Sequence, residues 1–142
     1  MMEGRANRRQ VRVEFGHCDP AELVYYPTYF AWFDQSTHHL FESVGISWRE
    51  LAARFGIQAP LVDAQVRFIS PAAWGDHLEI ESCVERWGNR SFVVSHRIVN
   101  AATGISVAEG KETRVCVQLR PGAPKGITAT PIPSDIKKAF ER

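Results

Sequence analysis

The sequence places an acidic residue, Asp19, in a turn between a strand-like segment and a helix-like segment. Pro20 follows it directly, and Tyr26-Pro27 opens an apolar, aromatic-rich helical pattern a few residues later. A helix N-terminus offers unpaired backbone N–H groups and a partial positive charge. A carboxylate beside such a helix start suits acyl transfer, because the carboxylate supplies the reacting group and the N–H groups stabilise an oxyanion. An acid in a turn is more often a cap or a solvated residue, so the rest of the chain must decide.

Other reactive side chains lie close to Asp19 in the sequence. A nucleophilic Cys18 would need a base, and the adjacent residue is His17. Neighbouring side chains on an extended segment point to opposite faces, so a catalytic Cys18–His17 pair is the less favoured alternative. His38 and His39 are adjacent on the expected helix and point apart, whereas zinc needs three or four converging ligands. We therefore expect no metal and no cofactor.

Composition is that of an ordinary globular protein. The 142 residues are 44% hydrophobic and 23% charged, with a net charge of +1. This length predicts one domain over residues 1–142, with 1–9 and 121–142 peripheral. The near-neutral charge argues against a nucleic-acid partner. The sequence has no run of 18 apolar residues and no secretory signal pattern, so we expect no membrane partner. Three cysteines without CxxC spacing are typical of reduced thiols, so we expect a cytoplasmic protein.

Turn and cap residues mark the expected helices. Pro27 suits the first turn of a long helix, and Gly45 suits its C-terminus. Ser47 and Glu50 form a capping box for a short helix that ends before Gly56. Alternation of apolar and polar residues predicts strands at 10–16, 61–69, 77–87, 91–100 and 105–119, and a final helix is expected at 134–142 after an irregular proline-rich segment.

A strand, two helices and then a run of strands indicate an α+β fold. We expect an antiparallel sheet of five or more strands wrapped around a long central helix, which is the hot-dog architecture. Such a sheet leaves an edge strand, and pairing of edges across a two-fold axis buries it. The chain is therefore expected to form a homodimer, assembling further as a homotetramer.

Three segments of the sequence resemble the 4-hydroxybenzoyl-CoA thioesterase family of hot-dog proteins. They are FGHCDPAELVYYPTY at 15–29 with WFD at 32–34, RFISPAAWGD at 67–76, and WGNRSF at 87–92. The resemblance extends from about residue 10 to residue 119. The first segment is the most specific, whereas the second is shared by many hot-dog thioesterases and says less about the substrate.

The resemblance implies an enzyme that hydrolyses an aromatic acyl-CoA of the hydroxybenzoyl or benzoyl type. Asp19 matches the carboxylate that attacks the thioester carbonyl or activates water, and the backbone N–H of Tyr26 matches the oxyanion donor. Asp34 matches a contact to the ring hydroxyl, and Arg90 matches a basic position that binds the CoA phosphates. Tyr25 belongs to the aromatic residues expected as core or as the lining of an acyl pocket.

The chain departs from the family pattern beside the expected catalytic residue. His17 stands where the family has an acid, and Glu22 stands where it has a glycine. Glu22 either perturbs or replaces Asp19 as the base, or is a solvated loop residue, and His17 contacts either the acyl group or a neighbouring subunit. Arg120 and Lys125 are further candidates for phosphate contacts.

Several interpretations stay open from the sequence. Asp34 is either a contact to the substrate hydroxyl or a structural group hydrogen-bonded to its surroundings. The acyl group is either aromatic or a short to medium aliphatic chain. A non-catalytic acyl-CoA or acyl-carrier binding protein would have the same fold, because function resides in the site rather than in the fold.

Overall fold

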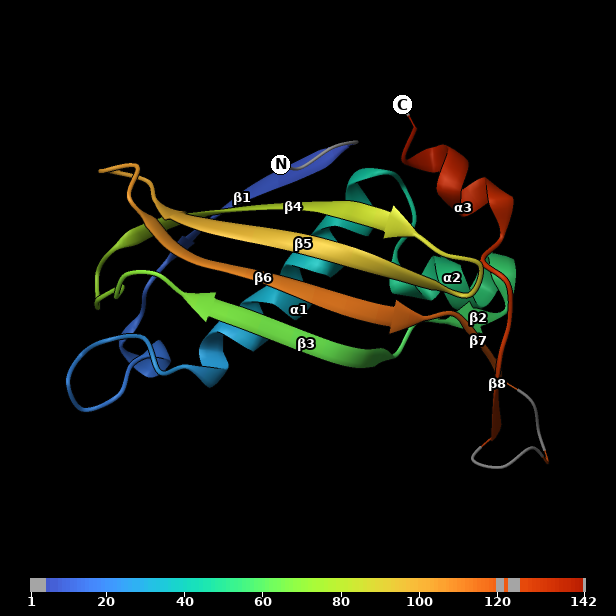
Figure 1. Cartoon of the computed structure of the whole chain (residues 1–142), viewed down its shortest axis with the longest axis horizontal. Coiled ribbons are helices and arrows are strands. Elements are labelled where there is room, and N and C mark those ends of the chain that lie inside the picture. The colour runs from blue at the N-terminus through green and yellow to red at the C-terminus, as the bar shows by residue number, and fades with distance from the viewer. Residues whose placement is uncertain (1–4, 120–121, 123–125, 142) are drawn as a thin grey trace.

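A five-stranded antiparallel sheet carries the long helix α1 across one of its faces (Figure 1). The computed structural model describes residues 5–119, 122 and 126–141, so Arg120 and Lys125 lie outside the described residues. In spatial order the strands are β1 (Ala6–Arg12), β4 (His77–Trp87), β5 (Ser91–Asn100), β6 (Ser106–Val115) and β3 (Leu61–Phe68). This arrangement confirms the predicted α+β hot-dog fold.

Helix α1 (Pro27–Ser43) begins and ends where its sequence predicts. Pro27 occupies the first turn, where a missing N–H costs no hydrogen bond. At the other end Gly45 adopts a φ of 82°, a left-handed conformation that glycine tolerates without a steric penalty. The helix therefore spans the sheet as one uninterrupted element.

The short helix α2 (Trp48–Phe55) also follows its capping signals. The Ser47 hydroxyl accepts a hydrogen bond of 3.2 Å from the Glu50 backbone N–H, and Gly56 ends the helix with a φ of 65°. Helix α3 (Ser134–Ala139) closes the chain. Both short helices lie at the end of the sheet where β4 finishes, and the loop between β1 and α1 lies at the opposite end (Figure 1).

Two predicted strands have different bounds in the structure. The first strand occupies Ala6–Arg12 rather than residues 10–16, because its earlier residues pair with β4, with Arg8 opposite Glu81 and bonded to it at 2.6 Å. The last predicted strand divides at Cys116 into β6 and β7 (Val117–Leu119). Strand β7 leaves the main sheet and joins β2 (Ile57–Gln58) and β8 (Ile127–Ala129) in a small second sheet. Of these three strands, β8 lies in the proline-rich segment expected to be irregular.

The core consists of two apolar clusters that meet different parts of α1. Toward its N-terminus, Tyr29, Trp32 and Phe33 pack with β4, β5 and β6. Toward its C-terminus, Leu40 and Phe41 pack with residues of α2, α3 and the strand ends. None of the helices in the described part of the chain is long and apolar enough to cross a membrane.

Gly110 on β6 lets α1 approach the sheet closely. A Cβ atom built on Gly110 would lie 2.2 Å from the Phe33 ring and 2.6 Å from the Gln65 carbonyl oxygen. Phe33 in turn stacks on the His96 ring with a centroid separation of 4.6 Å and an interplanar angle of 4°. The ring therefore occupies the space that any other residue at position 110 would need.

We predict that Gly110→Ala lowers the free energy of unfolding by about 1–3 kcal/mol, the usual cost of overpacking a core. Chemical denaturation followed by tryptophan fluorescence measures the change. Gly16→Ala is the matched control, because nothing lies within 4 Å of its Cβ position. Equal stability of the two variants would contradict the close packing of Phe33 on Gly110.

Candidate active site

The loop from Glu14 to Tyr26 is tied to the chain between β3 and β4. The Asp19 backbone N–H donates to the Leu23 carbonyl at 2.9 Å, which closes the loop on itself. The Val24 N–H donates to the Ala72 carbonyl, and the Trp74 N–H donates to the Glu22 carbonyl, both at 2.9 Å. These bonds fix the position of Asp19 although the loop has little regular structure of its own.

The Asp19 side chain is half-buried and only partly engaged. Its Oδ1 atom accepts a hydrogen bond of 2.9 Å from the Ala21 backbone N–H, an Asx-turn that orients the carboxylate. Its Oδ2 atom has no hydrogen-bond partner among the described residues. One carboxylate oxygen is thus held by the loop and the other remains available for a ligand.

The start of α1 leaves one backbone donor unused, that of Tyr26. The Tyr25 N–H donates to the His17 carbonyl and the Thr28 N–H to the Tyr25 carbonyl, each at 2.9 Å, and Pro27 has no N–H. Within the described part of the chain, the Tyr26 N–H has no acceptor. An unpaired donor at a helix N-terminus, where the helix dipole also favours negative charge, is suited to an oxyanion.

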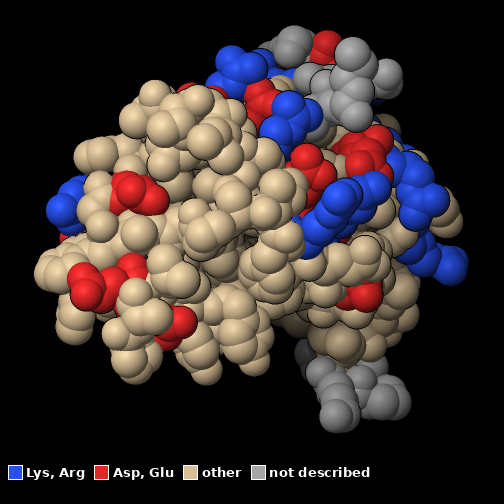
Figure 2. Space-filling view, turned by 60° about the vertical axis from the view of Figure 1, so that its left-hand side comes forward, with Lys and Arg blue, Asp and Glu red and all other residues tan. Residues whose placement is uncertain are grey.

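Asp19 and Tyr26 meet at one cavity of about 360 Å³. The lining is largely apolar and consists of Asp19, Leu23, Val24, Tyr26, Tyr29, Phe68, Ile69, Ser70, Pro71 and Ala72. Figure 2 brings this end of the molecule forward and shows acidic side chains set in a mostly uncharged surface, with most of the visible Lys and Arg gathered away from it. The cavity therefore combines one carboxylate, one free donor and an apolar wall.

Tyr29 contributes a neutral phenol to this lining. Burial is the main cause that raises its pKa to about 12, with smaller contributions from the charges of Asp76 and Cys18. Its ring makes edge contacts with Trp32 and Phe68. The sequence analysis treated Tyr29 only as one of several core aromatics, although its spacing of three from Tyr26 places both on one side of the helix start.

Cys18 lies beside this loop without the features of a nucleophile. Burial, followed by the charges of Asp19 and Glu22, raises the pKa of its thiol. The thiol donates a weak hydrogen bond to the Glu14 carbonyl, with a sulfur–oxygen distance of 3.5 Å. The structure therefore favours the protonated thiol, which agrees with the preference for Asp19 over Cys18.

His17 connects the loop to the helix start. Its Nδ1 atom accepts a hydrogen bond of 2.9 Å from the Glu14 backbone N–H, so that the neutral ring carries its proton on Nε2. The His17 carbonyl accepts from the Tyr25 N–H and from the Thr28 hydroxyl. Its ring packs edge-on against Trp32. The contacts in one chain give His17 a scaffolding role, and a contact to substrate stays a prediction.

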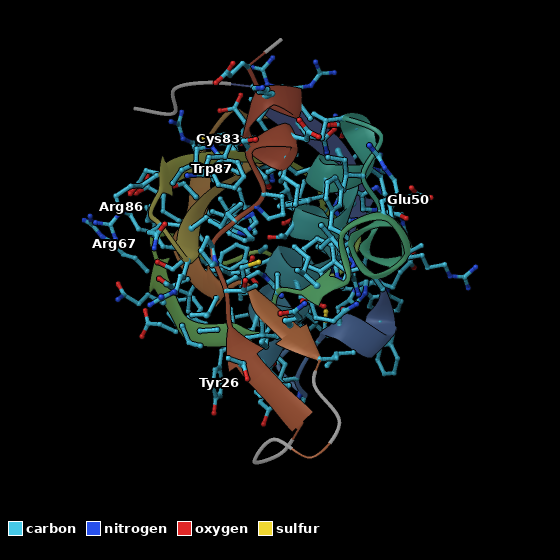
Figure 3. All side chains as sticks on the ribbon, turned by 90° about the vertical axis from the view of Figure 1, so that its right-hand side faces the viewer. Tyr26, Glu50, Arg67, Cys83, Arg86 and Trp87 are labelled. Carbon is cyan, nitrogen blue, oxygen red and sulfur yellow. The ribbon has the colours of Figure 1, made fainter. Side chains whose placement is uncertain are left out.

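Glu22, Tyr25 and Arg90 lie away from the cavity lining. Glu22 is exposed with a φ of 65°, and Tyr25 is 52% exposed with its ring against that of Tyr26. Tyr26 itself points its ring outward at the edge of the molecule, away from Arg67 (Figure 3). Arg90 is exposed in the hairpin between β4 and β5, at the end of the sheet opposite the loop. The contacts of Tyr25 and Arg90 to substrate and the role of Glu22 beside Asp19 remain predictions.

Asp34 lines a second cavity, of about 300 Å³, at the end of the molecule that carries the small sheet. The lining comprises Asp34, His38, Trp48, Gln58, Ala59, Pro60, Arg114, Val117, Leu119 and Ile127. The Asp34 Oδ1 atom accepts from Nη2 of the buried Arg114 at 2.6 Å. One chain therefore brings Asp19 and Tyr26 together and leaves Asp34 at a different cavity.

The described residues contain no cluster of three or more His, Cys, Asp or Glu that could hold a metal ion.

Comparison with known proteins identifies relatives with a common chemistry. The model of the thioesterase-like superfamily matches residues 13–140. The 4-hydroxybenzoyl-CoA thioesterase of Pseudomonas sp. strain CBS-3 is 35% identical over 102 residues, which are 70% of this chain and 72% of the relative. Its solved structure superposes with a TM-score of 0.85 at 32% identity, covering 95% of this chain and 99% of that one. A 1,4-dihydroxy-2-naphthoyl-CoA hydrolase of Thermosynechococcus vestitus is 26% identical over 93% of this chain and 89% of its own length.

We predict that Glu22→Gly raises the free energy of unfolding by about 0.5–1 kcal/mol, because glycine removes the steric cost of a left-handed backbone. The greater flexibility of glycine in the unfolded chain offsets part of this gain. Glu22→Ala keeps the strained conformation and should show no such gain. Because the side chain does not line the cavity, both variants should keep kcat/KM near the wild-type value. A large loss of turnover in both would instead assign the carboxylate a part in catalysis.

Proposed function

Since the chain belongs to the thioesterase-like superfamily, we propose that it hydrolyses an aromatic acyl-CoA, of the hydroxybenzoyl or benzoyl type, to the free acid and CoA. The chain is an acyl-CoA thioesterase of the hot-dog fold. The observation that carries the proposal is one cavity lined by both Asp19 and Tyr26. Among the described residues, one carboxylate oxygen of Asp19 and the backbone N–H of Tyr26 have no hydrogen-bond partner. No cofactor is needed, because a thiolate is already a good leaving group.

Asp19 acts in this proposal either as the nucleophile or as the general base. Its Oδ2 atom either attacks the thioester carbonyl, forming a mixed anhydride that water then hydrolyses, or removes a proton from a water that attacks directly. In both routes the C–S bond breaks and CoA leaves as the thiolate. Both routes pass through a tetrahedral oxyanion.

The Tyr26 N–H stabilises that oxyanion. A well-placed donor of this kind contributes roughly 3–4 kcal/mol to the transition state, and the helix dipole adds to it. Pro27 has no N–H, and the N–H groups of Tyr25 and Thr28 are already bonded. The Tyr26 N–H is therefore available without reorganisation before the reaction. The apolar lining limits competing water and strengthens the interaction.

The aromatic preference rests on the cavity wall and on the relatives. Tyr29 and Phe68 line the cavity and are in edge contact with each other, with ring centroids 5.4 Å apart. Flat aromatic groups pack favourably against such rings. The two relatives named above act on hydroxylated aromatic acyl-CoA substrates according to their names. An aliphatic acyl group would pack against the same cavity wall without the ring-to-ring contacts.

A second copy of the chain would bring Asp19 and Asp34 to one substrate. We propose pairing through β3, because its free edge and the segment after it expose apolar side chains, namely Leu61, Val62, Phe68 and Ile69. The other edge strand, β1, carries Arg8, Arg9 and Arg12, and charges on an edge discourage pairing. The chain is therefore expected to act as a homodimer, and a further tetramer stays a prediction.

We predict that Asp19→Asn lowers kcat for the best aromatic acyl-CoA by at least about a thousandfold while KM or Kd changes little, because the variant keeps the shape of the loop and loses the nucleophile or base. Steady-state hydrolysis followed through release of the CoA thiol measures the change. Asp135→Asn, an exposed acid on α3, is the control. Near-normal turnover by Asp19→Asn would exclude the assignment.

The same assay run over a panel of acyl-CoA substrates tests the acyl group. We expect kcat/KM to be highest for hydroxybenzoyl- or benzoyl-CoA and lower for short and medium aliphatic chains. A preference for aliphatic chains would replace the aromatic proposal. Tight binding of every substrate without hydrolysis would contradict the enzyme assignment itself.

We also predict that Val62→Lys shifts the wild-type dimer toward monomer in sedimentation velocity and lowers kcat/KM, because a charge on β3 blocks edge pairing. Gln10→Lys places the same charge on the exposed face of the β1 edge and should leave the dimer intact. A wild-type chain that sediments as a fully active monomer would overturn the dimer proposal.

A further inference from the structure

Asp34 is anchored by a buried ion pair whose partner is itself held rigidly. Its carboxylate side chain is 53% exposed, so solvent alone would leave it free to rotate. Instead Oδ1 accepts from Arg114 Nη2 at 2.6 Å, a residue 80 positions away in the sequence. The pair differs from an ordinary surface ion pair, in which two solvated side chains hold each other only weakly.

Arg114 is fixed on several sides. It is 4% exposed, and its Nη1 atom donates to the Ala59 carbonyl at 3.1 Å. Its guanidinium carbon lies 5.4 Å from the centre of the Trp48 ring, within the range of a cation–π contact. Nη2, which reaches Asp34, also donates to Glu112 Oε2 at 3.1 Å. These contacts therefore hold the guanidinium of Arg114, including the Nη2 atom that bonds Asp34, in one position.

Glu112 anchors Arg114 to the interior. It is 2% exposed, and its Oε1 atom accepts from the Thr37 hydroxyl and from His96 Nε2, the latter at 2.8 Å. Ser82 Oγ lies 2.7 Å from His96 Nδ1. In the neutral imidazole that donates from Nε2 to Glu112, Nδ1 accepts this hydrogen bond from the Ser82 hydroxyl. Burial opposes the charged form of Glu112, but the His96 hydrogen bond and the Arg114 charge outweigh it and lower its pKa. Burial lowers the pKa of His96, so the imidazole stays neutral.

The carboxylates of Glu112 and Asp34 both accept hydrogen bonds from the single guanidinium of Arg114, Glu112 in the interior and Asp34 at the exposed end. Asp34 Oδ2 accepts no hydrogen bond from the described residues. Asp34 lines the second cavity together with Trp48 and His38. The Nε2 atom of His38 lies 3.9 Å from Asp34 Oδ1. A fixed carboxylate accepts a hydrogen bond from a hydroxyl, repels an anionic substituent and gains nothing from a bare C–H.

We propose that Arg114 is a positioning residue that fixes the Asp34 carboxylate as the acceptor for a ring hydroxyl, so that the enzyme selects hydroxylated aromatic acyl groups over unsubstituted ones. The inference rests on the proposed function and on the contact of Asp34 with the acyl ring. It assigns the selectivity to a residue that does not itself touch the substrate. Glu112 and His96 hold the positioning residue in place.

The test compares binding of 4-hydroxybenzoyl-CoA and benzoyl-CoA by titration calorimetry, in an Asp19→Asn background that prevents turnover. We expect this parent to prefer the hydroxylated ligand roughly 10- to 100-fold, the size of one hydrogen bond to a charged group. Asp34→Ala should reduce the preference to about threefold or less, since no acceptor remains.

Arg114→Lys is the decisive variant because it keeps the buried charge. One ammonium group cannot span Glu112, Asp34 and the Ala59 carbonyl, and the buried Glu112 is expected to retain it, since an unpaired charge costs more inside than at the surface. Asp34 is then released, and the preference should fall about tenfold or more, with little further loss when Asp34→Ala is added. Arg8→Lys is the matched control, because Arg8 pairs with Glu81 at the same 2.6 Å and lines neither cavity.

Two outcomes overturn the inference, and they differ from failure of the proposed function. A preference that Arg114→Lys leaves unchanged, even if both ligands bind more weakly, would make Arg114 merely structural. A preference that Asp34→Ala leaves unchanged would remove the contact that Arg114 is said to position. Binding of neither ligand by the parent would overturn the aromatic substrate itself and the inference with it.

Discussion

The buried carboxylate of Glu112 is the constraint around which the middle of the molecule is arranged. An uncompensated charge in the interior is costly, so hydrogen-bond donors must surround it. Thr37 supplies one from α1, His96 one from β5, and Arg114 one from β6. The same contacts therefore fix the rotation and the height of α1 over the sheet. A purely apolar interface would hold the helix with less directional preference.

The position of α1 then determines what its two parts can do. Its N-terminus meets the loop that carries Asp19, where the Tyr26 N–H has no acceptor among the described residues. Farther along, Asp34 meets the guanidinium that also serves Glu112. The helix is thus the common frame of two cavities at different ends of the sheet. A shift of the helix that disturbed Glu112 would move the Tyr26 N–H, which is the proposed oxyanion donor, together with the Asp34 carboxylate.

Local chemistry explains which parts of this arrangement the sequence predicts. Pro27, Gly45 and Ser47 define helix ends through their own backbone and side-chain geometry, and the structure confirms those ends. The pairing of Asp19 with the helix start is equally local. The Asp34–Arg114 contact spans 80 positions and depends on the register of β6 against α1, which a single sequence does not reveal. The early start of β1 depends in the same way on its cross-strand partner Glu81.

The places where the chain departs from local preference gather around the Asp19 cavity. Glu22 has a left-handed backbone, Tyr26 keeps an unused donor, and Leu23 and Phe68 expose apolar surface at the cavity wall. Each is unfavourable for an isolated chain, and proteins retain such features mainly where a ligand or a partner compensates for them. In the proposed function, the carbonyl oxygen of a bound acyl-CoA accepts from the Tyr26 N–H, and the proposed second copy across β3 covers the apolar wall. In the proposed function the Asp19 end is therefore completed by substrate and by a second copy, whereas both carboxylate oxygens of Glu112 already accept hydrogen bonds within one chain.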